Sequence, residues 1–105
     1  MEQPNLTYIN ELSGDSLEFK NKMIAILKKE LPEEIENYER QMYNANFLAA
    51  AQAVHKLKHK ISILGLEKSY YLAETFEENL KQNREDLKND FELILKNITD
   101  FVNAL

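Results

Sequence analysis

The sequence contains no cysteine, and it has only two glycines and two prolines in 105 residues. Without cysteine the chain can form no disulfide, no thiolate nucleophile and no zinc site with sulfur ligands, which suits a reducing compartment such as the cytoplasm. Because glycine and proline are the usual breakpoints between elements, their scarcity predicts long helices with few interruptions. A chain of this length supports one hydrophobic core, so we expect a single domain over residues 1–105.

Long hydrophobic runs and a surplus of positive charge are also missing. No apolar stretch approaches the roughly 20 residues of a membrane span. The N-terminus, MEQPNLTYINEL, lacks the basic start and continuous apolar core of a signal peptide. With 13 basic and 18 acidic residues, the net charge of -5 argues against the broad cationic face that nucleic-acid binding needs. We therefore expect neither a membrane nor a nucleic acid as a partner.

Apolar residues recur every three or four positions along most of the chain, which is the spacing of amphipathic helices. A short first helix is expected at about residues 5–12, with Leu6, Ile9 and Leu12 on one side, and Gly14 should end it.

The second helix is expected to be long. Asp15, with Glu18 three residues later, predicts a capping box at its start. A buried stripe should follow, and it continues past a proline: Phe19, Met23, Ile26, Leu27, Leu31, Ile35, Tyr38 and Met42. Pro32 is therefore expected either to kink this helix or to open its second half.

The third helix is predicted at about residues 46–64, with Asn46 as its N-terminal cap. Gly65 should stop it, and Leu66 should fold back onto its end. Its buried stripe is expected to comprise Phe47, Ala50, Val54, Leu57, Ile61 and Leu64.

Two further helices complete the pattern. The fourth, at about residues 67–82, should bury Leu72, Ala73, Phe76 and Leu80. The last should carry an apolar stripe to the end of the chain: Leu87, Phe91, Ile94, Leu95, Ile98, Phe101, Val102 and Leu105. Long amphipathic helices with short connections predict an all-α fold, an antiparallel up-down four-helix bundle with a short extra N-terminal helix over one end. Such a bundle needs no partner chain to fold, so we expect a monomer.

Aspartate and glutamate are absent from residues 41–66, although the chain has 18 of them elsewhere. This segment holds both histidines, and its three cations are Lys56, Lys58 and Lys60. His55 lies about 100° around the helix from the buried stripe, so it should face water. The lysines should favour its neutral, nucleophilic form and stabilise a dianionic group attached to it. This arrangement favours phosphoryl chemistry at His55.

Helical spacing places further residues on the same flank as His55, because residues three and four apart are neighbours. Side chains of Lys58 and His59 should lean back toward it. The predicted docking flank comprises Leu48, Ala51, Gln52, His59 and Ser62, together with Lys58.

Other interpretations of the histidines exist. A surface histidine beside lysines is often only solvated. His55 and His59, at i and i+4, could also ligate a metal. Flanking lysines without a nearby carboxylate argue against this, and no Glu-x-x-His pair is present for a di-iron bundle. We therefore expect no metal and no cofactor on this chain.

The run His55-Lys56-Leu57-Lys58-His59, with Gly65 ten residues after His55, resembles the HxLKGxxxxxG signature of histidine-containing phosphotransfer (HPt) domains. Similarity extends to "LSGD" before the long helix, "LP" within it, and the later Leu72, Phe76 and Glu77. The resemblance implies that His55 is the phosphoacceptor and that Lys58 is the cation beside the phosphoryl group.

The resemblance also implies a function. Such domains are phosphoryl carriers without a kinase activity or nucleotide site of their own, and this sequence has no glycine-rich phosphate loop. They relay a phosphoryl group between aspartates of receiver domains, here expected on a hybrid sensor kinase and a response regulator. Any Mg²⁺ belongs to the receiver. The alternative is a helical interaction module without phosphotransfer activity.

One position departs from the family pattern, because His59 stands where a small residue is usual. It could swing aside, contact the phosphoryl group, select a particular partner, or mark a copy that has lost activity. We expect partner selection. The sequence leaves open the cognate kinase and regulator, and whether the domain is free-standing or part of a hybrid kinase, although the start at Met1 favours a free-standing protein.

Overall fold

A computed structural model describes residues 2–105, and every regular element in that range is a helix. In chain order these are α1 (Thr7–Ser13), α2 (Leu17–Tyr43), α3 (Phe47–Ile63), α4 (Glu67–Lys81) and α5 (Lys88–Asn103). The predicted all-α fold with a short extra N-terminal helix is confirmed.

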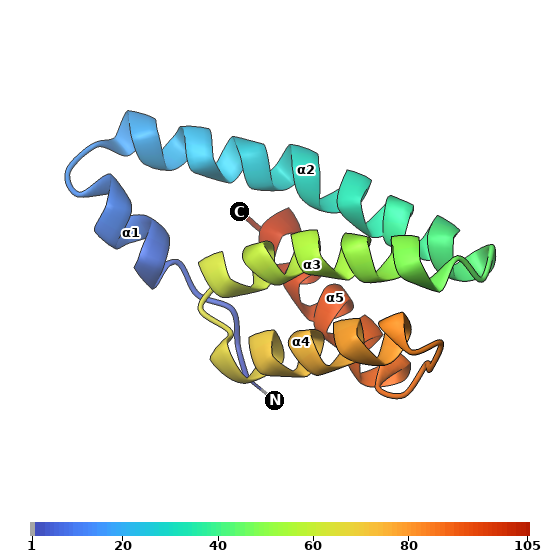
Figure 1. Cartoon of the computed structure of the whole chain (residues 1–105). Coiled ribbons are helices and arrows are strands. Elements are labelled where there is room, and N and C mark those ends of the chain that lie inside the picture. Colours follow the sequence, from blue (N-terminus) through green and yellow to red (C-terminus); the bar gives the residue numbers. More distant parts are fainter. Residues whose placement is uncertain (1) are drawn as a thin grey trace.

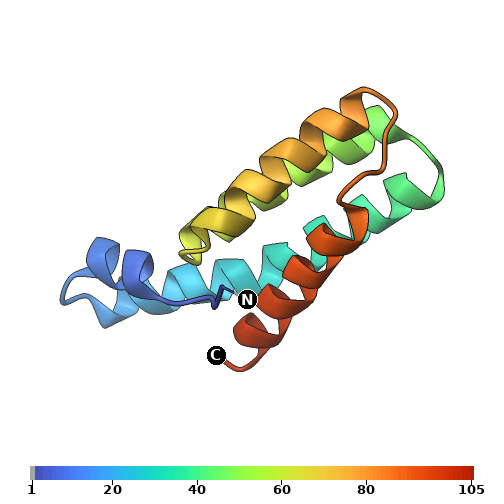
Figure 2. The same ribbon diagram turned by 90° about the horizontal axis from the view of Figure 1, so that it is seen from below.

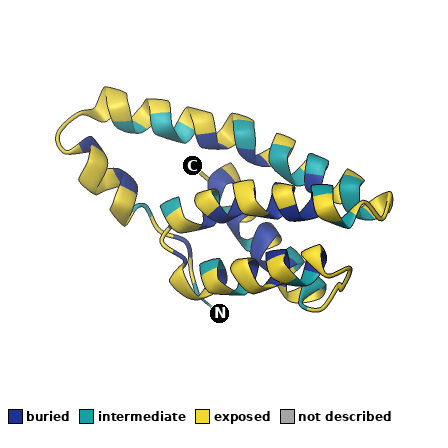
Figure 3. Cartoon of the chain, in the orientation of Figure 1, coloured by how far each residue is buried: buried dark blue, intermediate teal, exposed yellow. Residues whose placement is uncertain are grey.

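The four long helices form the bundle. Packing runs around it from α2 to α3, α3 to α4, α4 to α5 and α5 back to α2. Figures 1 and 2 show α3 and α4 side by side, with α2 and α5 closing the other side. Short turns connect successive helices, so neighbours run antiparallel. Figure 3 shows that the buried stretches of the long helices lie mainly where these helices face one another.

The first turns of α2, before Leu27, extend beyond the other long helices and have α1 beside them (Figure 1). Two members of its predicted stripe, Phe19 and Ile26, are exposed. Phe19 lies in the turns that the other long helices do not cover, and Ile26 lies about 100° around the helix from the buried Leu27. Met23 is partly buried against the core, and Leu27 is the first member of the stripe that is buried. On α1, Ile9 is fully buried, while Leu12, one turn later, is exposed.

The start of α2 differs from the prediction by one residue. Ser16, not Asp15, is the N-cap, and its hydroxyl accepts the backbone N–H of Phe19 at 3.1 Å. Either side chain can cap a helix, so the sequence pattern could not decide between them. Pro32 lies inside α2, and the helix continues through it to Tyr43.

Helix α3 follows its prediction closely. Asn46 caps it, accepting the backbone N–H of Ala49 at 3.2 Å. At its end Gly65 has φ +80°, and the N–H groups of Gly65 and Leu66 donate to the carbonyls of Ser62 and Ile61, at 3.0 and 3.2 Å. This is the expected glycine cap, with Leu66 fully buried against the helix end.

The apolar faces of α4 and α5 are mostly buried as predicted. Leu72, Leu87 and Phe101 are only partly buried against the core. Leu105 is exposed, since α5 ends at Asn103, so the stripe does not reach the last residue as predicted.

The segment before α1 ties three helices together, which the sequence did not indicate. The carboxylate of Glu2 accepts the N–H groups of Lys68 and Ser69 at the start of α4, each at 2.9 Å. Its backbone carbonyl accepts the side-chain N–H of Asn97 on α5 at 3.1 Å. The Asn5 N–H donates to the Leu64 carbonyl at 2.9 Å. Glu2 thereby supplies the cap that α4 lacks.

Within residues 2–105 no helix combines the length and the apolar composition that crossing a membrane would take.

Candidate functional site

His55 is presented on an exposed flank of α3. Its neighbours Val54 and Leu57 are fully buried in the core and fix the rotation of the helix. The His55 side chain retains 53% of its exposure. The predicted position of this imidazole, beside the core and open to solvent, is therefore confirmed.

A carboxylate from α4 meets this histidine. Glu77 is buried on the inner side of α4, and its carboxylate lies 3.3 Å from the His55 Nδ1. The same carboxylate accepts a hydrogen bond from the Lys58 Nζ at 3.1 Å and pairs with the Lys81 Nζ at 3.4 Å. One buried acid thus joins the histidine and two ammonium groups.

The surroundings of Glu77 keep it charged. Burial by itself raises the pKa of the Glu77 carboxyl, but the hydrogen bond and charge of Lys58 oppose this, with a further contribution from His55. Their sum holds the pKa of Glu77 below its usual value of 4.5. The group is therefore an anion near neutral pH, and it can only accept hydrogen bonds.

This anion sets the tautomer of His55. Because a carboxylate accepts and does not donate, the geometry assigns the proton of a neutral imidazole to Nδ1, which donates to Glu77. The lone pair then resides on Nε2, the nitrogen of the ring that does not face Glu77. His55 consequently offers a fixed nucleophile toward solvent.

Lys58 lies deeper than predicted. Its side chain is only 8% exposed, so its expected place on a solvent-facing flank is wrong. Its Nζ lies 3.1 Å from Glu77, 3.8 Å from Glu74 and 5.4 Å from the centre of the Tyr70 ring. An ammonium can be buried here because α4 supplies its counter-ion, which helical spacing within α3 does not reveal.

The predicted docking flank is exposed except at two positions. Leu48, Gln52, His59 and Ser62 are exposed around His55. The two buried positions are Lys58 and Ala51. Ala51 is fully buried in the core, so the prediction that it contacts a partner is wrong. The rings of His55 and His59 are 5.1 Å apart, centre to centre, at 88° to one another.

The opposite flank of α3 also carries a lysine among carboxylates. Lys60 pairs with Glu30 and Glu34 of α2, at 3.0 Å each. Burial lowers the pKa of Lys60, but the hydrogen bonds to the two glutamates outweigh it and hold that pKa above the usual 10.5. The prediction that the lysines of this segment have no carboxylate nearby is therefore wrong, because neighbouring helices supply the carboxylates.

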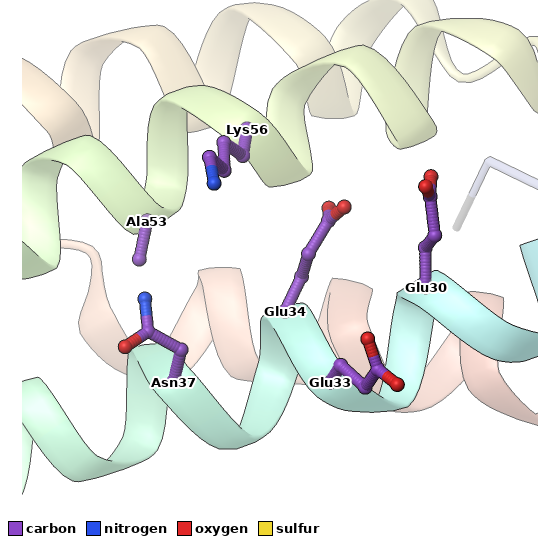
Figure 4. A pocket seen from close by; sticks show the side chains of 6 residues that line it. All are labelled: Glu30, Glu33, Glu34, Asn37, Ala53 and Lys56. Carbon is purple, nitrogen blue, oxygen red and sulfur yellow. The ribbon is translucent and has the colours of Figure 1, made fainter.

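Beside Lys60 lies a cavity of about 300 Å³ between α2 and α3. Figure 4 shows Lys56 reaching into it from α3 and Glu34 from α2. Neither His55 nor His59 lines this cavity. Over the described part of the chain, no three histidine or carboxylate side chains are grouped as a preformed metal site.

Glu77 is the site residue that sequence reasoning did not assign a role. The sequence position of Glu77 could have indicated this role. Ala73, Phe76 and Leu80 form the apolar inner face of α4, and Glu77 lies among them. A carboxylate on a buried face requires a cationic partner. The lysine-bearing helix α3 was the place to look for that partner.

Comparison with known proteins bears on this arrangement. The family model described as Hpt domain matches residues 22–104. Searches of the curated proteins and of the solved structures return no match. The match covers α2 from residue 22 and all of α3, α4 and α5, and His55 lies on α3. This chain belongs to the Hpt domain family.

Proposed function

We propose that this chain is a histidine phosphotransfer protein, which takes a phosphoryl group from one receiver-domain aspartate onto His55 and gives it to another. Hpt domains act in histidine phosphotransfer in two-component signalling and are carriers, not kinases. One observation carries the assignment to His55: an exposed imidazole whose Nδ1 is held by the buried Glu77 carboxylate, which Lys58 also contacts.

The proposed transfer begins with the Nε2 lone pair of His55. It attacks the phosphorus of an aspartyl phosphate in line, so that an N–P bond forms while the P–O bond to the aspartate breaks. The aspartate leaves as a carboxylate, and the ring becomes a phosphorylated imidazolium that keeps its proton on Nδ1. A carboxylate of a second receiver then attacks the same phosphorus and restores neutral His55. No proton needs to leave the site in either step.

Glu77 supports both steps in this proposal. Its negative charge, 3.3 Å from Nδ1, stabilises the positive charge that develops on the ring. Its hydrogen bond also orients the ring, so that Nε2 faces an approaching phosphoryl group. Since phosphoryl transfer relies mainly on positioning and charge stabilisation, this fixed imidazole supplies much of what is needed.

Lys58 has a different task. A bare carboxylate near His55 would repel an incoming dianionic phosphoryl group. The Nζ of Lys58, 3.1 Å from Glu77, and that of Lys81, 3.4 Å away, offset this charge. Lys58 thus keeps the neighbourhood of His55 acceptable to an anion.

The exposed residues around His55 are the proposed docking surface: Leu48, Gln52, His59 and Ser62. The proposed partners are receiver domains of a hybrid sensor kinase and of a response regulator, which bring their own Mg²⁺. We place this exchange in the cytoplasm and assign the chain as a monomer.

A labelling experiment tests the proposal. The purified protein, mixed with a phosphorylated receiver domain, should gain the mass of one phosphoryl group, and acid should remove it. His55→Gln should keep its helical circular dichroism and gain no label, while Glu11→Gln, at an exposed position of α1 outside the docking surface, serves as the control. Equal labelling of the His55→Gln variant would overturn the assignment. Failure of the intact protein to be labelled by any receiver would favour an interaction module.

A further inference from the structure

Two imidazoles lie one helical turn apart on the exposed flank of α3. His55 and His59 are four residues apart, and their ring centres are separated by 5.1 Å. Two histidines at i and i+4 on one face of a helix can bind a single Zn²⁺ together. Both side chains are exposed, so a hydrated ion can reach them.

A second observation concerns the other nitrogen of His55. Histidine ligands of metals almost always donate their remaining ring N–H to a carboxylate, a carbonyl or water, which fixes the tautomer and increases the basicity of the ligating nitrogen. The Nδ1 of His55 already faces the buried carboxylate of Glu77 at 3.3 Å. Nε2 is therefore prepared as a ligand on the side of the ring away from Glu77.

From the sequence alone, the positive charge of nearby lysines argued against a metal. In the fold, carboxylates of neighbouring helices pair with these lysines. Lys58 is paired with Glu77 and Glu74, and Lys60 with Glu30 and Glu34. Lys56 reaches into the acidic cavity toward α2, as Figure 4 shows. A divalent cation at the histidine pair would thus face ion-paired ammonium groups, with carboxylates among its neighbours.

We propose that His55 and His59 form a two-ligand site for a divalent transition metal that prefers imidazole, such as Cu²⁺, Ni²⁺ or Zn²⁺. Water completes the coordination, because no third histidine or carboxylate is grouped with the pair among residues 2–105. By the usual order of stability, Cu²⁺ binds more tightly than Ni²⁺ or Zn²⁺. Mg²⁺ prefers oxygen ligands and is not bound there.

The site has a regulatory consequence, which rests on the proposed function. Metal coordination at His55 uses the Nε2 lone pair, the same pair that attacks phosphorus. A ring nitrogen cannot make both bonds at once, so the bound metal and the phosphoryl group exclude one another. His59 then acts as the second ligand that makes inhibition by a transition metal effective at low concentration.

Binding is tested without any phosphoryl chemistry. Zn²⁺ is titrated into the protein in a non-coordinating buffer, and heat release and the histidine ¹⁵N NMR signals are recorded. We expect one Zn²⁺ per chain and shifts of both histidines. His55→Gln and His59→Gln should each weaken binding by more than about tenfold, since losing even an outer-shell partner of a ligand costs about 10–100-fold. Ser62→Ala should bind as the native protein does.

Equal Zn²⁺ affinity in the His59→Gln variant, or a complete absence of binding, would overturn the inference. Mg²⁺ in place of Zn²⁺ should leave the histidine signals unchanged, and a response to Mg²⁺ would point to the carboxylates instead.

Competition is tested with phosphoramidate, a small phosphodonor that needs no receiver. Zn²⁺ should slow labelling of the native protein far more than that of His59→Gln, each measured against its own metal-free rate, and a chelator should reverse the effect. Equal inhibition of both proteins would overturn the regulatory role. If the metal-free protein takes no label while Zn²⁺ binding depends on both histidines, the proposed function fails and the metal site stands.

Discussion

On one flank of α3, Lys58 meets the carboxylate of Glu77 from α4; on the other, Lys60 meets Glu30 and Glu34 from α2. Both ammonium groups are largely buried, and both pairs join α3 to a neighbouring helix. Only the first flank adds a histidine, and there the carboxylate serves two groups at once. The ion pair itself is therefore a structural feature common to both flanks. The function depends on what else the carboxylate holds.

The largest expected difference between the flanks is in the labelling rate of His55. Glu77→Gln should slow labelling by about 10²-fold, because an amide can present its N–H to Nδ1 and no longer fixes the productive orientation. Glu34→Gln, the matched change at the partner of Lys60, should leave the rate unchanged. Initial rates of phosphate uptake check both. A Glu77→Gln protein as fast as Glu34→Gln would remove the distinction between the flanks.

Stability should distinguish the flanks less than function does. Lys58→Met and Lys60→Met should each lower the free energy of unfolding by about 1.5–3 kcal/mol, the range for a hydrogen bond to a charged group. Urea unfolding followed by circular dichroism measures this. Only Lys58→Met should also reduce labelling. If Lys58→Met leaves stability intact, Lys58 is not the structural cation that its burial indicates.

The two flanks should respond to opposite ends of the pH scale. The pKa of Glu77 is lowered by its partners, so its contribution to stability is present above its usual pKa of 4.5 and is lost as the pH falls through the lowered value. The pKa of Lys60 is raised, so its contribution is present below 10.5 and is lost as the pH rises through the raised value.

Melting temperatures across pH test these signs. Glu77→Gln should flatten the acid side of the profile relative to the native protein, and Lys60→Met should flatten the alkaline side. Acid profiles that coincide for the native protein and Glu77→Gln would show that the carboxyl does not contribute as its contacts indicate.

The smallest expected effect concerns His59, which is exposed on the same flank as His55 and lies beside its ring. His59→Ala should change labelling rates by a few-fold, and by different factors with different receivers, because it removes bulk for some surfaces and a contact for others. A panel of phosphorylated receivers measures this, with Glu11→Ala, at an exposed position of α1 outside the docking surface, as the control. One common factor across the panel would make His59 irrelevant to partner choice.

Local features of the fold were predictable from the sequence, and contacts between helices were not. The stripe of α3, the Asn46 cap and the Gly65 stop each depend on residues within a few positions of one another. By contrast, Phe19 is exposed because α2 extends beyond the helices that pack against it. The relative lengths of the helices decide this, and they are not a local property of the sequence.

The site divides in the same way. His55 was placed correctly because its angle from the buried stripe of α3 is a local property. The burial of Lys58 was missed because its counter-ion, Glu77, is 19 residues away on α4. Many acids elsewhere in the chain could have supplied that partner. Packing of α3 against α4 makes the choice.

We infer that Glu77 holds the Nδ1 proton of His55 and leaves Nε2 as the acceptor. Long-range ¹H–¹⁵N NMR of the ¹⁵N-histidine-labelled protein, before and after phosphorylation, tests it directly. We expect His55 to carry a proton on Nδ1 and, after labelling, a phosphoryl group coupled to Nε2. A proton on Nε2 in the free protein, or phosphorus on Nδ1 after labelling, would contradict it.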